Sequence, residues 1–459
     1  MTNNHVAVLD VGKTNVKVAL FDLQNGSEIL AVSRPNIVVE DPPWPHFDIE
    51  GHWQFFLDNL AEFHAKHRVD AISVTTHGAS IALLDADGVL AAPILDYEHD
   101  LPADIAASYD DIRPPFHETG SPRLAMGLNV GAQLFWQFHV DPTLKDRSRT
   151  ILTYPQYWTH RLTGIATTDV TSLGCHTDLW NPVEQTFSSL ADRLGIADKI
   201  AQPRRPTDVL GAILPEVASR TGLAETTPVV CGIHDSNASL LPYLLHKPAP
   251  FSVVSTGTWV IAMSIGGDRV SLQPEFDTLI NVSALGTPVA SARFMGGREY
   301  DVISEGRSCE PSDEDIASVL RNSIMLLPAV VPDAGPFPGK EAHWHGERPP
   351  AGTGVREAAL GFYLALVTRR CLELIGHSGP VIVEGPFAKN RCYLMMLEAV
   401  TETDIEAVVS ATGTSKGAAI LFKKEKLSEV SSAPAQFSRQ NQLAQQMKNY
   451  ANTWARLVN

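Results

Sequence analysis

Apolar stretches and polar turns alternate in the same order at two places in this chain. Residues 5–21 predict a β-hairpin, because the apolar runs HVAVLDV and VKVALF flank the polar turn GKTN. Residues 251–264 predict a second hairpin, in which FSVVS and WVIAMS flank the turn TGT. This weak repeat, with the linker-like HKPAP at 246–250, predicts two domains over residues 1–245 and 246–459.

Helical and buried-strand patterns follow each hairpin. Residues 50–68 carry apolar side chains at helical spacing, and DAISVT at 70–75 predicts a buried strand. In the second half, residues 355–376 give the strongest helical pattern of the chain, and PVIV at 380–383 predicts another strand. Strands that alternate with helices indicate an α/β fold.

Composition and charge limit the functions that this fold can carry. The chain has 36 Lys and Arg against 52 Asp and Glu, which gives a formal charge of −16. This balance argues against nucleic-acid binding but leaves room for a small phosphorylated ligand. The five cysteines form no CxxC pair, so neither a disulfide framework nor a zinc site is indicated. With no signal-peptide pattern and no apolar run of about 18 residues, we expect a cytoplasmic protein that does not enter a membrane.

The turn of the first hairpin has the chemistry of an anion site. Glycine and the backbone N–H groups of a turn can cradle a phosphate, Thr14 adds a hydroxyl, and Lys13 or Lys17 adds a positive charge. Asp10 at the strand end could hold Mg²⁺ through water. A plain hairpin turn explains the same residues, but a similar turn at 255–258 favours a phosphate site, and no GxxxxGK[ST] loop competes with it.

One carboxylate lies between a predicted strand and a predicted helix. Asp235 follows Gly232, Ile233 and His234, and could take a proton from an alcohol that attacks phosphorus. The alternative is a helix N-cap, for which aspartate is well suited. His77 and His234 are equally open between a ligand contact and a satisfied structural role.

Seven short motifs, taken together, resemble those of the FGGY carbohydrate kinases, which belong to the superfamily of sugar kinases, actin and heat-shock chaperone ATPases. The resemblance runs from about residue 5 to about residue 422. It rests on motifs that occur in one order: DVGKTNVK at 10–17, THG at 76–78, YWTHRLTG at 157–164, GIHD at 232–235, STGT at 255–258, EGPFAKN at 384–390 and ATGTSKGAA at 411–419.

The resemblance implies two ribonuclease-H-like domains of the actin-like ATPase type, with a cleft between them. It also implies a set of site residues. The first phosphate loop comprises Asp10, Gly12, Lys13, Thr14, Asn15 and Lys17, and the second comprises Ser255, Thr256, Gly257 and Thr258. The adenosine contacts are Gly385, Phe387, Asn390 and Gly413, and the sugar contacts are His77, Gln156, His234 and Asp235. Asp235 is the catalytic base, and Asp10 and Asp235 are the Mg²⁺ residues.

The resemblance further implies transfer of the γ-phosphoryl group of ATP, with Mg²⁺, to a hydroxyl of a small sugar. A ketose is expected, namely L-fuculose, L-rhamnulose or a pentulose, and a homodimer is compatible with the sequence. The loop EGPFAKN at 384–390 replaces the run of glycines that family members commonly carry. This departure leaves an alternative, a nucleotide- or sugar-binding sensor of the same fold that transfers no phosphate.

Overall fold

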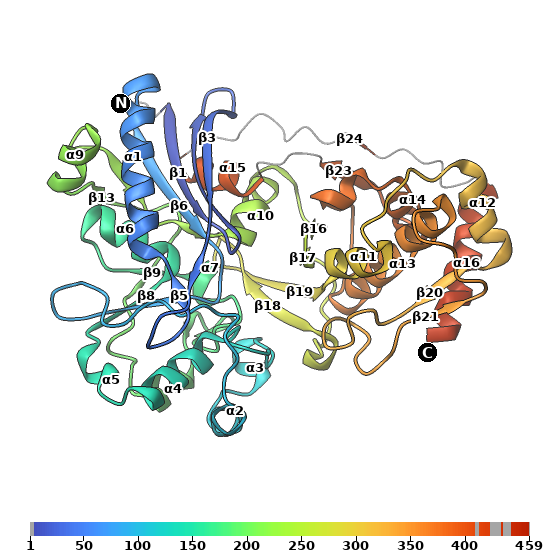
Figure 1. Ribbon diagram of the computed structural model, residues 1–459, viewed down its shortest axis with the longest axis horizontal. Coiled ribbons are helices and arrows are strands. Elements are labelled where there is room, and N and C mark those ends of the chain that lie inside the picture. Colours follow the sequence, from blue (N-terminus) through green and yellow to red (C-terminus); the bar gives the residue numbers. More distant parts are fainter. Residues whose placement is uncertain (1–3, 409–412, 423–432, 435–441, 459) are drawn as a thin grey trace. The chain divides into compact units, whose positions relative to one another are not determined.

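The computed structural model describes residues 4–408, 413–422, 433–434 and 442–458. Contacts divide the chain into two compact units, whose elements are labelled in Figure 1. The first unit comprises Met1–His246, Ile280–Pro288 and Thr412–Val430, and the second comprises Lys247–Leu279, Val289–Ala411 and Ser431–Asn459. The chain therefore leaves the first unit one residue beyond the predicted boundary, and two later segments return to it.

A mixed sheet forms the centre of the first unit. Its strands follow the order β13-β14-β6-β1-β2-β3, with β15 also paired to β6. Strands β1, β2 and β3 are antiparallel, whereas β6 runs parallel to β1, and β14 and β15 run parallel to β6. The strands are β1 (His5–Val11), β2 (Asn15–Asp22), β3 (Ser27–Pro35), β6 (Ala71–Thr76), β13 (Val209–Ala212), β14 (Pro228–Val230) and β15 (Ile233–His234).

Both faces of this sheet are covered, which explains why β1 is apolar along most of its length. Ala7 and Leu9 pack in one apolar cluster with residues of α1 and α6. Val6 and Val8 point to the opposite face and pack with residues of α10 and α15. The covering helices are α1 (Ile49–His67), α6 (Tyr154–Thr163), α10 (Asp235–His246) and α15 (Gly413–Ala419). The first unit is therefore a three-layer α/β structure.

The sheet of the second unit repeats this strand pattern. Its order is β18-β19-β17-β16-β22-β23-β24, with antiparallel pairing of β16, β17 and β19 and parallel pairing of β16, β22 and β23. The strands are β16 (Phe251–Thr256), β17 (Val260–Ile265), β18 (Thr278–Val282), β19 (Pro288–Phe294), β22 (Val381–Glu384), β23 (Ile405–Val408) and β24 (Ala433–Pro434). Of these, β18 after Leu279 and the first residue of β19 belong to the segment Ile280–Pro288 that is assigned to the first unit. The structure thus places both hairpins of the sequence repeat at equivalent positions of two similar sheets.

Smaller elements complete both units. Those of the first unit are α2 (Ala103–Asp110), α3 (Phe116–Thr119), α4 (Val130–Val140), α5 (Leu144–Arg147), α7 (Val170–Leu173), α8 (Ser189–Leu194), α9 (Pro215–Thr221), η3 (Ile420–Phe422), β4 (Val38–Val39), β5 (His46–Phe47), β7 (Ile81–Leu84), β8 (Thr150–Thr153), β9 (Thr168–Asp169), β10 (Trp180–Asn181), β11 (Thr186–Phe187) and β12 (Pro203–Arg204). Those of the second are η1 (Pro274–Phe276), α11 (Gly296–Ser304), α12 (Asp313–Asn322), α13 (Gly354–Leu374), η2 (Pro386–Lys389), α14 (Arg391–Thr401), α16 (Gln442–Val458), β20 (Met325–Leu327) and β21 (His343–His345).

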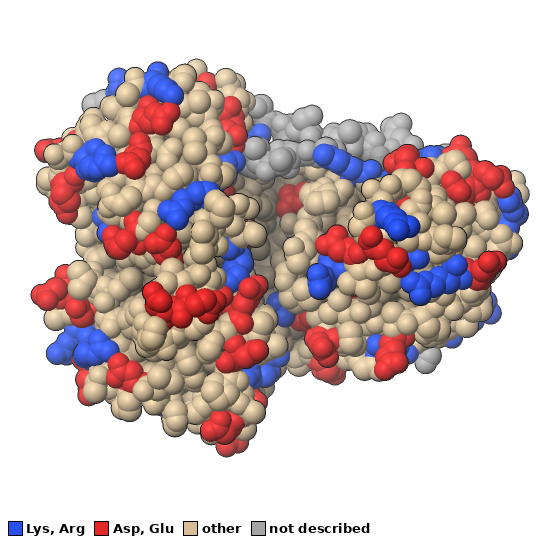
Figure 2. All heavy atoms as spheres, viewed as in Figure 1, with Lys and Arg blue, Asp and Glu red and all other residues tan. Residues whose placement is uncertain are grey.

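Charged side chains of both signs are interspersed on the face of the molecule that Figure 2 shows, and no continuous basic stripe crosses that face. Within the described part of the chain, no helix combines the length and the apolar character that a membrane span requires.

Helices α10 and α15 approach each other closely within the first unit. A Cβ atom at Gly417 would lie 1.7 Å from the carbonyl oxygen of Ala238, so only glycine permits this backbone contact. The approach also carries Ser415 to the end of β1, where its Oγ donates a hydrogen bond to Asp10 Oδ2 at 2.5 Å. The α10–α15 contact therefore helps to position the first hairpin turn.

A buried histidine supports the same turn through Asn36. Asn36 donates from its backbone N–H to Thr14 O (2.9 Å) and from Nδ2 to Gly12 O (2.9 Å). His52, which is fully buried on α1, bonds through Nε2 to Asn36 Oδ1 at 2.8 Å. Because Asn36 Oδ1 is an acceptor, His52 must carry its proton on Nε2. Burial, together with the positive charge of Arg34, lowers the pKa of His52 to about 4, so the imidazole is neutral near pH 7.

We predict that His52 makes the folded state less stable in acid. The pKa of His52 is about 4 in the folded protein against 6.5 for a free side chain, so the unfolded chain binds the proton first as the pH falls. The contribution of His52 to the free energy of unfolding is therefore fully present above about pH 6.5. It is lost as the pH falls towards 4, by up to about 3 kcal/mol. H52Q keeps a donor for Asn36 but has no titrating side chain at this position. Its unfolding temperature should therefore decrease less between pH 7 and pH 4 than that of the wild type. H67Q, an exposed change at the end of the same helix, is the control, and equal pH dependence in wild type and H52Q would contradict this account.

Candidate functional site

Three parallel strands of the first unit end side by side, and each end carries a polar side chain. Asp10 of β1 lies opposite Thr75 of β6, and Thr75 also lies opposite Ile233 of β15. His77 directly follows β6, and its backbone N–H donates to Val11 O at 2.8 Å. Asp235 directly follows β15. The carboxyl ends of parallel strands in an α/β sheet are where ligands bind, so the structure brings these predicted residues to such an edge.

The first turn offers backbone and hydroxyl donors, while its lysines are paired with acids. Gly12 N–H donates to Asn15 O at 2.9 Å, and the side chains of Thr14 and Asn15 are exposed. Lys17 Nζ bonds to Glu28 Oε2 at 2.7 Å, and Lys13 Nζ bonds to Asp96 and lies 3.2 Å from Glu98 Oε2. The positive charge expected at this turn is therefore compensated on both lysines.

The carboxyl group of Asp10 is poised to meet a cation. Desolvation, opposed by the hydrogen bond from Ser415 and reinforced by the nearby negative charge of Asp235, raises the pKa of Asp10 to about 6. Two mutually repelling carboxylates with few cationic neighbours are a donor set that suits Mg²⁺, which takes one or two carboxylates and keeps several waters. Among the described residues, no cluster of three or more acidic, histidine or cysteine side chains forms a closed metal cage.

Asp235 is the first residue of α10 and keeps one carboxylate oxygen open. Ser236 N–H donates to Oδ1 at 2.6 Å, and His234 Nε2 lies 3.1 Å from the same atom. Among the described residues, none hydrogen-bonds Oδ2, and 32% of the side chain is exposed. The side chain therefore has a fixed orientation and a free acceptor atom.

His77 is buried with one ring nitrogen unsatisfied. Its ring packs among Phe47, Tyr97 and Tyr154, with centroids 5.1–5.3 Å away. Nδ1 donates to Gly78 O at 2.8 Å, and burial lowers the pKa of His77 to about 4. A neutral ring with its proton on Nδ1 leaves Nε2 as an acceptor, and Nε2 is buried with no partner in the described part of the chain. Such an orphan acceptor at a strand end points to a ligand hydroxyl.

A hydrogen bond and close packing hold His234 in place. Its backbone N–H donates to Thr171 Oγ1 at 3.0 Å, and Thr171 Oγ1 donates to the buried Asp169 at 2.5 Å. Its Nε2 lies 3.7 Å from Cys175 Sγ, and a Cβ at Gly78 would be 2.8 Å from that nitrogen. These contacts fix the backbone from which Asp235 projects.

Gln156, a predicted sugar contact, is fully buried and bonded on both ends of its amide. Nε2 donates to Cys231 O at 2.8 Å, and Oε1 accepts from Thr153 Oγ1 at 2.5 Å. In this arrangement Gln156 supports the segment before His234, and its contact with a sugar remains a prediction.

Sequence reasoning missed an aromatic and acidic group beside His77. Lys13 Nζ lies 4.9 Å from the centroid of Tyr97 and 5.4 Å from that of Phe47, so Lys13 points towards the surroundings of His77. Its acidic partners Asp96 and Glu98 flank Tyr97 in the sequence. The signal that could have found this group is the pattern DYEHD, which alternates charged and aromatic side chains after a strand.

The second turn belongs to the second unit and is closely packed. Gly257 N–H donates to Trp259 O at 2.9 Å, and Gly297 N–H at the start of α11 donates to Thr258 O at 3.2 Å. A Cβ at Gly297 would lie 2.1 Å from Gly257 O, so the helix start and the turn are in backbone contact.

Thr256 joins this turn to the predicted adenosine loop. Its Oγ1 donates to Glu384 O at 2.5 Å and accepts from Phe387 N–H at 3.1 Å. Gly385 has φ +85°, and a Cβ there would lie 2.0 Å from Thr256 O, so this position requires glycine. Asn390 Oδ1 caps α14 by accepting from Tyr393 N–H at 3.0 Å.

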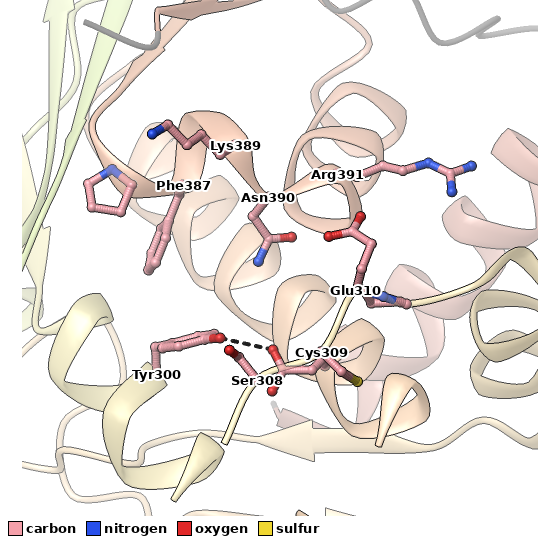
Figure 3. A pocket seen from close by; sticks show the side chains of 11 residues that line it. Tyr300, Ser308, Cys309, Glu310, Phe387, Lys389, Asn390 and Arg391 are labelled. Atoms are coloured by element: carbon pink, nitrogen blue, oxygen red, sulfur yellow. Dashed lines mark hydrogen bonds between the residues drawn. The ribbon is translucent and has the colours of Figure 1, made fainter. Parts of the chain in front are cut away.

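A cavity of about 390 Å³ opens beside this loop within the second unit, and Figure 3 shows its side chains. It is lined by Tyr300, Ser308, Cys309, Glu310, Pro311, Glu357, Pro386, Phe387, Lys389, Asn390 and Arg391. Two of the predicted adenosine residues, Phe387 and Asn390, therefore face one cavity. Gly413 begins α15 in the first unit, and its contact with adenosine remains a prediction.

Comparison with known proteins identifies the family. Residues 5–242 match the model of the FGGY carbohydrate kinase N-terminal domain, and residues 248–430 match that of the C-terminal domain. A carbohydrate kinase structure from Novosphingobium aromaticivorans has 37% identity and a TM-score of 0.90, covering 99% of this chain and 100% of that one. A xylulose kinase structure from Rhodospirillum rubrum has 18% identity and a TM-score of 0.77, and the match covers 99% of this chain and 98% of that chain. The two proteins therefore share the fold.

Curated relatives match over a shorter span. L-fuculokinase of Salmonella typhi is 29% identical over 280 residues, which are 58% of this chain and 58% of the relative. Xylulose kinase of Escherichia coli strain K12 is 27% identical over 245 residues, or 50% of this chain and 48% of the relative. The chain thus matches about half the length of these relatives. The fold matches confirm the predicted two-domain α/β architecture, and the chain belongs to the FGGY family of carbohydrate kinases.

Proposed function

We propose that this protein is an ATP-dependent sugar kinase that transfers the γ-phosphoryl group to a hydroxyl of a small ketose. The observation that supports this most is Asp235, an oriented carboxylate with a free oxygen at the strand edge that also carries Asp10 and His77. Phosphoryl transfer needs positioning and charge neutralisation more than covalent chemistry, and the edge offers groups for both tasks.

On the sugar side, His77 and Asp235 have separate tasks. The free Nε2 of His77 accepts a hydrogen bond from one sugar hydroxyl. The side chains of Phe47, Tyr97 and Tyr154 hold the imidazole ring in place for this contact. Asp235 Oδ2 accepts the proton of the attacking hydroxyl, while Ser236 and His234 hold Oδ1.

On the nucleotide side, each unit by itself carries a glycine-containing turn to which we assign phosphate binding. The donors are the exposed side chains of Thr14 and Asn15 in the first turn, and the hydroxyl groups of the half-buried Ser255 and the exposed Thr258 in the second. Adenosine occupies the cavity beside Phe387 and Asn390.

Asp10 and Asp235 fit a Mg²⁺ ion that accompanies ATP, because their mutual repulsion is relieved by a dication. When bound, the ion neutralises charge on the phosphates. Asp10 itself is oriented for this task by the hydroxyl of Ser415.

A neutral sugar suits the charges of the site better than a sugar acid. Lys13, whose charge acts on His77, is already paired with Asp96 and Glu98, so its charge is compensated before a sugar binds. L-fuculose, L-rhamnulose and pentuloses remain the proposed substrates, and two relatives named above are an L-fuculokinase and a xylulose kinase. We place the reaction in the cytoplasm, where ATP is available.

Replacing Asp235 by asparagine tests the proposal. We expect kcat for the best sugar of a ketose, aldose and polyol panel to decrease about 10²–10⁴-fold, because the general base is lost. A coupled assay of ADP formation measures this, and D87N, in an exposed turn, is the matched control. Wild-type turnover in D235N would refute the mechanism, and a panel in which no sugar stimulates ADP formation would favour the sensor.

Replacing His77 by asparagine should affect sugar binding alone. Asparagine can still donate to Gly78 O but removes Nε2, so the KM for the sugar should rise about 5- to 100-fold while the KM for ATP stays within about twofold. Initial-rate kinetics with each substrate varied separately give both values, and H117N, an exposed change, is the control. An unchanged sugar KM would remove His77 from the sugar site.

A further inference from the structure

One carboxylate in the cavity of the second unit has no role in the proposed mechanism. Glu357 lies in the first turn of α13, lines the cavity and is only 5% exposed. Its Oε2 accepts a hydrogen bond from Tyr300 O–H at 3.0 Å, the dashed contact in Figure 3. Its Oε1 is buried, and no described residue donates to it.

An unsatisfied buried carboxylate oxygen is costly, so its retention at a cavity needs an explanation. Burial raises the pKa of Glu357, which is the sign that the charged form lacks sufficient partners in the free protein. A bound molecule that brings an N–H or O–H donor to Oε1 would remove this cost. The cavity is therefore complementary to a ligand with a donor at that position.

The cavity begins beside the phosphate turn of the same unit. Phe387 is tied through its backbone N–H to Thr256, which precedes that turn. Tyr300, whose ring centroid lies 6.4 Å from that of Phe387, joins this loop to Glu357 through its hydroxyl. A nucleotide whose phosphates contact the turn can therefore place its base in the cavity that Glu357 lines.

Aromatic and amide groups complete the base-sized space. The side chains of Phe387 and Tyr300 border the same hollow in Figure 3, with ring centroids 6.4 Å apart. Asn390 uses Oδ1 to cap α14, which leaves its NH₂ group as a donor in the cavity. The walls thus offer stacking surfaces, an acceptor at Glu357 and a donor at Asn390.

We propose that Glu357 selects adenine by accepting a hydrogen bond from the 6-amino group of the base at Oε1. This inference rests on the proposed function in one respect, namely that the cavity takes the nucleotide. The acceptor Oε1 matches the N6 amino donor of adenine, and the Asn390 amide matches a ring-nitrogen acceptor. Hypoxanthine presents an oxygen where adenine has its amino group, so it opposes the carboxylate oxygen. Guanine also carries an oxygen at position 6. Its N1 and N2 donors could bind a carboxylate only through both oxygens, and Tyr300 already donates to one oxygen of Glu357.

Calorimetric titration of the full-length protein with ADP, IDP and GDP tests this inference without requiring catalysis. ADP and IDP differ only at position 6 of the purine and, through tautomerism, at N1. We expect wild-type protein to bind ADP about 10- to 100-fold more tightly than IDP or GDP, as for one hydrogen bond to a charged group. Equal affinity for ADP and IDP would overturn the assignment, and a preference for GDP would assign the pocket to guanine instead.

The isosteric variant E357Q sharpens the test. Its amide oxygen can keep the Tyr300 hydrogen bond, so its NH₂ group replaces the free oxygen and faces the base. The ADP preference should then fall to within about threefold or invert towards IDP. E347Q, an exposed change in the same unit, should keep the wild-type preference, and an E357Q protein with that preference unchanged would also overturn the inference.

These titrations, combined with an assay of sugar phosphorylation by ATP and ITP, separate this inference from the proposed kinase activity. Selective ADP binding that depends on Glu357, without phosphoryl transfer to any sugar, would refute the kinase and support the adenine contact. Sugar phosphorylation with equal use of ATP and ITP would refute the adenine contact and support the kinase. Failure of the wild-type protein to bind any nucleotide would refute both.

Discussion

The parallel pairing of β1, β6 and β15 is the constraint on which the site depends. This register places Asp10, His77 and Asp235 at one edge of the sheet although they are far apart in the sequence. The strands are buried on both faces, so a one-residue shift of register would move each side chain to the opposite face and disrupt the packing of both apolar clusters. The stability of the core and the geometry of the site are therefore one property of this sheet.

Hydroxyl and amide groups, more than positive charges, shape the two turns. In the first unit Asn36 and Ser415 hold the turn and Asp10, and in the second unit Thr256 holds both the turn and the predicted adenosine loop. Lys13 and Lys17 are both paired with acids. Phosphates would thus be bound mainly by preorganised dipoles, which keeps the protein's net negative charge compatible with an anionic substrate.

Local patterns in the sequence were sufficient to predict the elements that carry the site. The hairpins and α13 were predicted because apolar periodicity decides such elements, and the strand–turn–helix context of Asp235 located its carboxylate. The supports of the site depend on tertiary contacts that no local pattern encodes. Asn36 and His52 reach the first turn from outside it, and the return of α15 to the first unit is a matter of topology. Glu357 resembles an ordinary acid in the first turn of a helix, and only its burial beside a cavity distinguishes it.

The fate of the γ-phosphoryl group tests the central claim most directly. Phosphorus NMR of the wild-type protein with ATP, Mg²⁺ and each ketose follows every phosphorus atom in one experiment. The account predicts that the γ resonance of ATP disappears as a sugar phosphate monoester resonance of equal intensity grows. Release of inorganic phosphate alone, or intact ATP in the presence of every sugar, would contradict it.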